Sequence, residues 1–267
     1  MKQTRPLPAG WTLHCFPSLA STNDEALRRA LAGAPHGTAI LAARQEAGRG
    51  RRGRSWHSPA GGLYLSVILR PDLAPERQRY LPLALGLALR ETLAESTGLN
   101  IGLKWPNDIQ WQGAKLAGIL VENVPGRPQA GSGFAVGGLG VNLAGDPTNL
   151  SRSLGRPVTS LTALSGREWQ KMDLIPSLLC QIDVWYQRLA LEGPQALLPV
   201  WRRHDTCRGQ ELLWHQPNGS TIAGQALGLD DSGAYIIRSA DGASIQVLAG
   251  DLLAPDAVPE TSETSTK

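Results

Sequence analysis

Cysteine and histidine are sparse in this chain and occur in no pattern that builds a site. The three cysteines, Cys15, Cys180 and Cys207, are far apart and form no CxxC pair. They predict no disulfide framework, which is typical of a protein of the reducing cytoplasm. The five histidines lack the spacing of metal ligands, so the sequence predicts no protein-held metal site.

Long apolar runs and a strong net charge are also missing. The longest apolar stretch, 81–89, contains a proline and is too short to cross a bilayer, and no signal-peptide core follows the first two residues. The net charge of the 267 residues is only +3, so the composition does not indicate a general nucleic-acid-binding surface. The length is enough for one large core and a second, smaller domain.

What the chain does have is a dense run of glycine and arginine, residues 45–59, with the sequence QEAGRGRRGRSWHSP. We name it the glycine-arginine loop. Its glycines allow the backbone to take positive φ and to approach a ligand closely. Its arginines offer forked donors that suit carboxylates and phosphates, and Trp56 can stack on a base. We interpret the loop as wrapping an anion joined to a ring system, such as a nucleotide or an acyl-adenylate.

The glycine-arginine loop also fits other sequence patterns in part. Gly48, Gly50 and Gly53 fit the G-x-G-x-x-G dinucleotide fingerprint, but the helix that this fingerprint requires does not follow. No Gly-Lys-Ser/Thr closes the loop, so it is not a P-loop. A solvated basic turn, or a contact with a nucleic-acid backbone, stays open as the simpler alternative.

The remaining pattern predicts an α+β domain followed by a small β-barrel. The barrel is indicated by short strands and Gly-rich turns after Cys207, and the tail after Pro255 is predicted to be disordered. The expected strands are 11–16, 37–43, 63–69, 101–105, 117–122, 134–142, 211–214, 220–227, 234–238 and 244–248; the expected helices are 21–31, 78–96, 166–190 and 194–204; turns are expected at 107–108, 125–133, 217–219, 231–233 and 241–242.

Three strand or helix ends carry further polar or glycine-rich motifs. At the first helix, Thr22 and Glu25 form a predicted capping box, and Ser21 or Thr22 can also bind a ligand at the helix N-terminus. The other two ends are 104–108, KWPND, followed by Lys115 with Gly118, and 137–142, GGLGVN. Each has a plain explanation as a turn, a solvated lysine or tight packing. Together with the loop, they predict one shared cleft.

In order and spacing, these motifs resemble the biotin protein ligase family, also called biotin–[acetyl-CoA-carboxylase] ligase. The resemblance covers about residues 13–253. It implies an α+β fold in which a mixed β-sheet covered by helices forms a catalytic domain at 1–205. It further implies an SH3-like β-barrel at 206–255, with the disordered tail at 256–267. About ten residues precede the first strand, so the winged-helix DNA-binding domain of some members, and repression by it, are not expected. The motifs that carry the resemblance are Ser21-Thr22-Asn23, Gln45 with GRGRRGRSW, SPAGGLYLS, KWPND, KLAGIL and GLGVN.

The resemblance also implies a reaction. The family joins biotin to ATP with Mg²⁺, releases pyrophosphate, and passes biotin from biotinyl-5′-AMP to one lysine of a carrier domain of acetyl-CoA carboxylase or a related carboxylase. Family members include monomers and homodimers, and neither DNA nor a membrane is an expected partner. We expect the barrel to help close the site on ATP or on the carrier.

Residue roles follow from the same resemblance. Lys115, Arg51 and Asp108 are the expected catalytic residues. The expected biotin-binding residues are Ser21, Thr22, Asn23, Gln45, Arg49, Gly50, Arg51, Lys115, Gly118 and Gly138; the expected nucleotide-binding residues are Arg49, Arg51, Arg54, Trp56, Asn107 and Asn142. A lipoate or octanoate ligase or transferase of the same fold is the nearest alternative function, and a nucleic-acid-binding module is a distant one.

Overall fold

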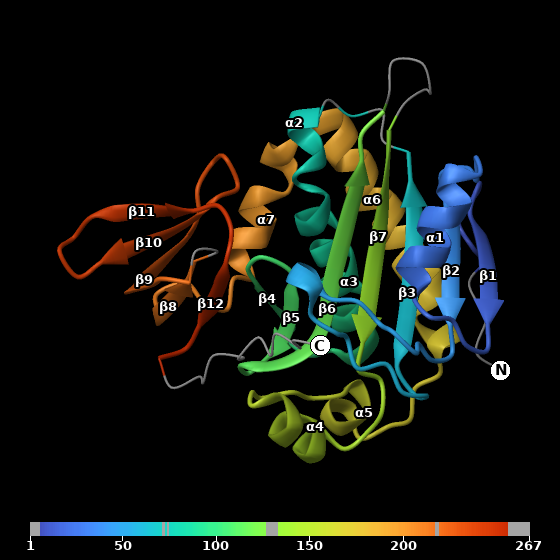
Figure 1. Ribbon diagram of the computed structural model, residues 1–267, viewed down its shortest axis with the longest axis horizontal. Coiled ribbons are helices and arrows are strands. Elements are labelled where there is room, and N and C mark those ends of the chain that lie inside the picture. The colour runs from blue at the N-terminus through green and yellow to red at the C-terminus, as the bar shows by residue number, and fades with distance from the viewer. Residues whose placement is uncertain (1–5, 71–72, 74, 127–132, 217–218, 256–267) are drawn as a thin grey trace, which may run out of the picture.

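A seven-stranded sheet forms the centre of the molecule (Figure 1). The structure is a computed structural model that describes residues 6–70, 73, 75–126, 133–216 and 219–255. The strand order is β1-β2-β3-β7-β6-β5-β4, with β1 and β2 parallel and the other neighbours antiparallel, so the sheet is mixed as expected. The strands are β1 Thr12–Phe16, β2 Thr38–Ala42, β3 Leu63–Leu69, β4 Gly102–Lys104, β5 Asp108–Trp111, β6 Ala114–Val124 and β7 Phe134–Val141.

Helices cover the two faces of this sheet unequally. Side chains alternate between the faces of a strand, and on β3 this sends Ile68 into a small cluster with Ala26 and Ala30 of α1, Thr22–Leu31. Val67, its neighbour, faces the larger cluster on the other side. There α3, Leu81–Thr97, packs against the sheet on one side and against α6, Ile175–Glu192, on the other. The face of the sheet on which α1 lies is less completely covered by helices, and it therefore has room for a ligand.

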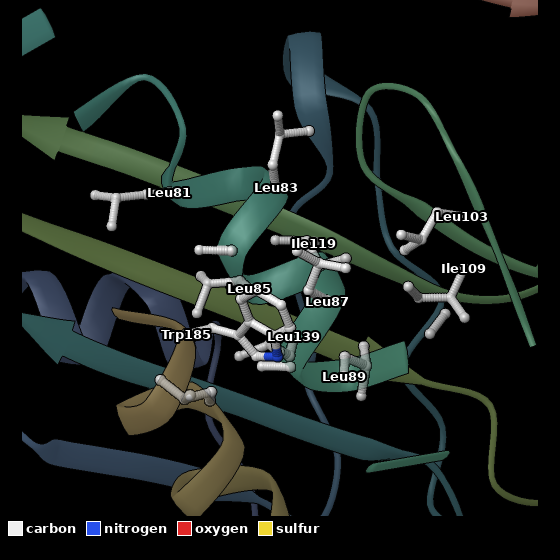
Figure 2. Packing of buried hydrophobic residues seen from close by; sticks show 14 of the residues in the cluster. Leu81, Leu83, Leu85, Leu87, Leu89, Leu103, Ile109, Ile119, Leu139 and Trp185 are labelled. Carbon is white, nitrogen blue, oxygen red and sulfur yellow. The ribbon is translucent and has the colours of Figure 1, made fainter. Parts of the chain in front are cut away.

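The large hydrophobic cluster packs against β6 and β7 on the face of the sheet opposite α1. Figure 2 shows leucines of α3 meeting Ile119 of β6, Leu139 of β7 and Trp185 of α6. Leu85 is 2% exposed and Ile119 is 3% exposed. Burying such a side chain contributes about 1.5–3 kcal/mol each, so this side of the sheet is a rigid support for whatever binds on its opposite face.

A second, antiparallel sheet follows at the C-terminal end and lies beside the β4 and β5 edge of the first (Figure 1). Tyr80 donates a hydrogen bond to the Ser232 carbonyl, and Trp105 packs against Tyr235 with ring centroids 5.7 Å apart. The two sheets therefore share packed side chains. The strand order is β11-β10-β9-β8-β12, with β8 Glu211–His215, β9 Thr221–Leu229, β10 Tyr235–Ser239, β11 Ser244–Val247 and β12 Asp251–Leu253.

The structure corrects several expected elements. Asp108 was predicted to lie in a turn but begins β5, because Lys104 pairs with it across a short hairpin. Residues 166–170, predicted helical, lie between helices. Strands β5 and β12 were not predicted, nor were the helices α2 Pro75–Gln78, α4 Pro147–Leu154 and α5 Leu161–Ser165; the last helix, α7, is Leu198–Arg203.

Parts of the expected turns at 125–133 and 217–219, and the whole tail 256–267, lie outside the described residues. Within the described part of the chain, none of the helices has the length and apolar character needed to cross a membrane.

Candidate active site

A cavity of about 580 Å³ lies on the α1 face of the sheet, over β6 and β7 and under the glycine-arginine loop. It brings together residues from both sheets, because β12 also contributes to its wall. Every predicted site residue except Asn142 lines it. These residues are Ser21, Thr22, Asn23, Gln45, Arg49, Gly50, Arg51, Arg54, Trp56, Asn107, Asp108, Lys115, Gly118 and Gly138.

One end of the cavity is polar and is built around the start of α1. Ser21 is the N-cap, and its side chain accepts a hydrogen bond from the Asp24 amide. The predicted capping box of Thr22 with Glu25 is therefore wrong, because the cap lies one residue earlier. Thr22 is instead the first helical residue, and its amide and hydroxyl both donate to Gln45 Oε1, at 2.8 and 3.0 Å. Gln45 in turn donates to Ser58.

Ser66 of β3 extends this polar network behind the cavity wall. It is fully buried, and its hydroxyl lies 2.7 Å from Thr22 Oγ1 and 2.6 Å from Asn23 Oδ1. An amide oxygen only accepts hydrogen bonds, so Ser66 is the donor to Asn23. The network fixes the side chains of Thr22 and Asn23 before any ligand is present. Sequence reasoning missed Ser66, whose strand pattern gave no sign that it faces α1.

The glycines of β6 and β7 make room for side chains as well as for a ligand. A methyl group on Gly138 would lie 2.2 Å from Asn23 Oδ1, and one on Gly140 would lie 2.6 Å from the indole of Trp56. Gly118 pairs with Gly140 across the strands and also contacts Trp56. The indole N–H of Trp56 is enclosed, and no hydrogen-bond partner for it is found among the described residues.

The other end of the cavity is cationic. Lys115, 9% exposed, lies 2.7 Å from the Asp108 carboxylate and 5.2 Å from the ring centroid of Trp56. Burial lowers the pKa of the Lys115 ammonium below its ordinary value, and Asp108 opposes that shift. The plain alternative for Lys115, a solvated lysine at the start of a strand, is therefore wrong. Arg156, which the sequence reasoning missed, lines the same end and further lowers the pKa of Lys115.

The four arginines of the loop have different partners. Arg49 is paired with Asp24 and Glu122, while Arg52 and Arg54 both reach Asp251 of β12, at 3.3 and 3.0 Å. Arg51 donates to Asn107 Oδ1 at 3.1 Å and, among the described residues, makes no ion pair with a carboxylate. Burial lowers the pKa of Arg51, which stays charged at neutral pH. Arg51 is therefore the loop arginine best able to meet an anion.

Asn142 lies in a neighbouring cavity of about 400 Å³. Its side chain donates to the Thr159 carbonyl at 3.1 Å, and Tyr64 lines both cavities. Asn142 thus lies outside the cavity that the other predicted residues line. Within the described residues, no group of three or more His, Cys, Asp or Glu side chains could hold a metal ion.

The chain was compared with known proteins. Residues 15–138 match the Biotin/lipoate A/B protein ligase family. The biotin–[acetyl-CoA-carboxylase] ligase of Paracoccus denitrificans is 33% identical over 229 residues, which cover 84% of this chain and 93% of that protein. The bifunctional ligase/repressor BirA of Bacillus subtilis is 32% identical over 225 residues, 84% of this chain and 68% of that protein.

Solved structures agree in fold. The biotin protein ligase from Aquifex aeolicus, in complex with biotin and ATP, superposes with a TM-score of 0.76 at 27% identity, covering 90% of this chain and 97% of that one. Sequence identity, coverage and the similarity of fold all lead to the same assignment. The chain belongs to the biotin protein ligase family.

Proposed function

We propose that the protein is an ATP-dependent ligase that activates biotin as biotinyl-5′-AMP and transfers it to a lysine of a biotin carboxyl carrier domain. The observation that carries this is a single cavity with an uncharged polar end and a cationic end. Gly118 lies next to Lys115, and four residues further along β6 Glu122 meets Asn23. Four residues of strand span about 13 Å, a length that suits a ring with an acid on a short chain.

Biotin is such a molecule. Its ureido ring is neutral and has both donors and acceptors, and it is proposed to lie against Ser21, Thr22, Asn23 and Gln45. Gly118, Gly138 and the Arg49–Gly50 backbone then enclose the ring and chain. The preformed hydrogen bonds of Thr22 and Asn23 support this placement, because a site already ordered loses little entropy on binding.

The carboxylate is proposed to lie at the cationic end beside the α-phosphate of ATP. Two unit charges about 4 Å apart repel by roughly 4 kcal/mol at an effective dielectric near 20, so cations are required between them. Lys115 and Arg51 are placed for this role. A carboxylate oxygen attacks the α-phosphorus, a P–O bond forms, and the bond to pyrophosphate breaks with that group leaving.

In the second half-reaction the amine of the carrier lysine attacks the acyl carbon. The new C–N bond forms, AMP leaves, and the ammonium proton must go to a base. Asp108 is the proposed base or orienting group. It holds Lys115 at 2.7 Å, so its oxygens lie where the acyl group is expected.

The nucleotide is proposed to extend from the cationic end past Trp56 into the cavity of Asn142. Arg51 and Arg54 would meet phosphate oxygens, Trp56 would stack on adenine, and Asn107 would hold Arg51 in place by their hydrogen bond. ATP would enter as its Mg²⁺ complex, which brings the metal with the substrate.

We also propose the division of the chain. Residues 1–205 would form the catalytic domain and 206–255 an SH3-like barrel, with 256–267 as a tail. The antiparallel order β11-β10-β9-β8-β12 supports the barrel. The proposed partner is the carrier domain of acetyl-CoA carboxylase or a related carboxylase, and the proposed compartment is the cytoplasm.

Pyrophosphate exchange into ATP tests the adenylating step, with biotin, lipoate or octanoate as the only acid. Exchange with biotin alone is the expected result. Exchange with lipoate or octanoate instead would move the chain to the lipoate branch of its fold. No exchange with any acid, from folded protein with Mg²⁺ present, would overturn the proposal.

A further inference from the structure

Glu122 lies near the end of β6, outside the cavity wall, and its carboxylate joins two parts of the site. One oxygen accepts a hydrogen bond of 2.8 Å from Asn23 Nδ2, and the other accepts one of 2.6 Å from Arg49. Asn23 belongs to the polar end of the cavity, and Arg49 belongs to the loop that covers it. A single side chain therefore contacts both the wall and the cover.

Contact with Glu122 decides which way Asn23 presents its amide. Because the nitrogen donates to Glu122, the oxygen must lie on the other side, where Ser66 donates to it. Gly138 packs against this same amide. If the Asn23 amide were rotated, its oxygen would face the Glu122 carboxylate. Two acceptors would then lie against each other, and that contact is repulsive.

Arg49 has a second carboxylate, Asp24, at the start of α1. Two acids thus surround one guanidinium, so the charge of Arg49 is already balanced within the protein. The family resemblance implies that Arg49 binds biotin and the nucleotide. Its two carboxylate partners argue against a role as the cation that meets the substrate carboxylate or phosphate. Its side chain instead ties the loop to α1 and β6.

We propose that Glu122 is a positioning residue that couples the orientation of Asn23 to closure of the glycine-arginine loop, and so sets how long biotin and its adenylate stay bound. The inference rests on the proposed function. When Arg49 leaves Glu122, the loop loses its contact with β6, and the carboxylate that accepts from Asn23 is no longer held in place by Arg49. Loop opening and loosening of the polar end are therefore one event.

The strength of this tie depends on the solvent. The side chains of Arg49, Asp24 and Glu122 are 42%, 51% and 26% exposed, so dissolved salt reaches them. Exposed ion pairs weaken as ionic strength rises, because the screening length shortens. The dissociation rate of biotin from the parent should therefore rise with salt concentration.

The test compares biotin dissociation rates in Glu122→Gln, Arg49→Gln and the double variant. Glutamine keeps the size of Glu122 and an acceptor for Asn23 but removes the charge that holds Arg49. Each single variant should release biotin about tenfold faster, a rate change equivalent to about 1.4 kcal/mol. The double variant should be no faster than the faster single one, because both changes break the same contact.

Glu192→Gln is the matched control. Glu192 pairs with Arg188 on α6, with similarly exposed side chains, far from the loop in sequence. It should release biotin at the parent rate. Raising ionic strength from about 0.05 to about 0.5 M should speed release from the parent and from Glu192→Gln but not from Arg49→Gln, which lacks the ion pairs with both Asp24 and Glu122. Rates that multiply in the double variant, or a salt effect that survives in Arg49→Gln, would overturn the coupling.

Amide hydrogen exchange without ligand separates this proposal from the function itself. Gly50 donates to the Arg54 carbonyl and Trp56 to the Gly48 carbonyl, so both amides report on the folded loop. Both should exchange faster in Glu122→Gln than in the parent or Glu192→Gln. Unchanged exchange of these two amides would refute the role of the Arg49–Glu122 contact in holding the loop. Faster exchange in Glu122→Gln, together with a parent protein that binds no biotin, would refute the proposed function but leave the contact between the loop and β6 supported.

Discussion

At the scale of single residues, the site is organised by how each cation is balanced. Lys115 has Asp108, Arg49 has Asp24 and Glu122, and Arg51 has the neutral Asn107. Buried charges without a partner are costly. Arg51 has a neutral hydrogen-bond partner, and the carboxylates of Asp251 and Asp108 act on it without an ion pair, so we propose that a bound anion balances its charge. The family resemblance assigns Arg49, Arg51 and Arg54 to ligand binding and gives Arg52 no role, and the structure gives the four arginines different partners.

Replacing Arg51 by glycine should leak the adenylate. The loop would lose the cation that meets the acyl-phosphate, and water and stray amines would then reach a reactive mixed anhydride. We expect biotin to appear on many proteins of a mixture at a rate at least several-fold above the parent, as measured by streptavidin blotting.

Arg52→Gly is the control within the same loop. Arg52 has φ of 58°, a conformation that glycine adopts easily, and its partner is Asp251. It should label only the carrier. If Arg51→Gly also modified the carrier alone, at the parent rate, the sequestering role of Arg51 would be wrong.

At the scale of elements, β7 serves the site on one face and the core on the other. A methyl on Gly138 would meet Asn23 Oδ1, whereas a methyl on Gly137 would lie 2.4 Å from Leu85 of α3. Adjacent residues on a strand point to opposite faces. The two glycines therefore offer a matched pair of substitutions, one against the ligand site and one against the hydrophobic core.

Gly138→Ala should weaken biotin binding by at least tenfold with little change in unfolding, because the displaced group is the Asn23 amide at the cavity wall. Gly137→Ala should lower the free energy of unfolding by about 1–3 kcal/mol, the usual cost of overpacking, with a smaller effect on biotin affinity. Calorimetric titration and urea unfolding measure the two effects. The reverse pattern would mean that the faces are misassigned.

Elements with a strong period were predictable from the sequence, and elements fixed by distant contacts were not. β3, at Leu63–Leu69, matches its prediction because a continuous apolar run fits a buried strand. β5 was missed because Asn107-Asp108 has turn chemistry, while Asp108 pairs with Gly118 of β6 as well as with β4. α4 does carry local signals, Asp146 as N-cap and Pro147 after it, which were not used.

At the scale of the whole molecule, the loop joins the two sheets. Asp251 of β12 binds Arg54 across 197 residues of sequence, and it lines the same cavity. Motifs identified the residues on the seven-stranded sheet and its loops that gather at the cavity, because each motif is a local stretch of sequence. Asp251, like Glu122, contributes through a partner far away in the chain, and a single sequence carries no signal for that pairing.

The Asp251 pairing should contribute to stability in a pH-dependent way. Burial raises its pKa, but Arg54, Arg51 and Arg52 outweigh that, so the pKa lies below the ordinary 3.8. A carboxylate with a lowered folded pKa contributes fully above its unfolded pKa, and the contribution is lost as pH falls through the folded value. Asp251→Asn should therefore lower the free energy of unfolding by about 1 kcal/mol at pH 7.

The difference between Asp251→Asn and the parent should shrink below pH 3.8 and approach zero once the Asp251 carboxyl is protonated. Urea unfolding across this pH range measures it. Asp231→Asn, at a side chain 99% exposed beside Arg202, is the control and should change little at any pH. A difference for Asp251→Asn that stays constant with pH would mean that the lost contact is not ionic. The loop would then be held to the second sheet by packing alone, and the carboxylate would have no part in placing Arg54 at the cavity.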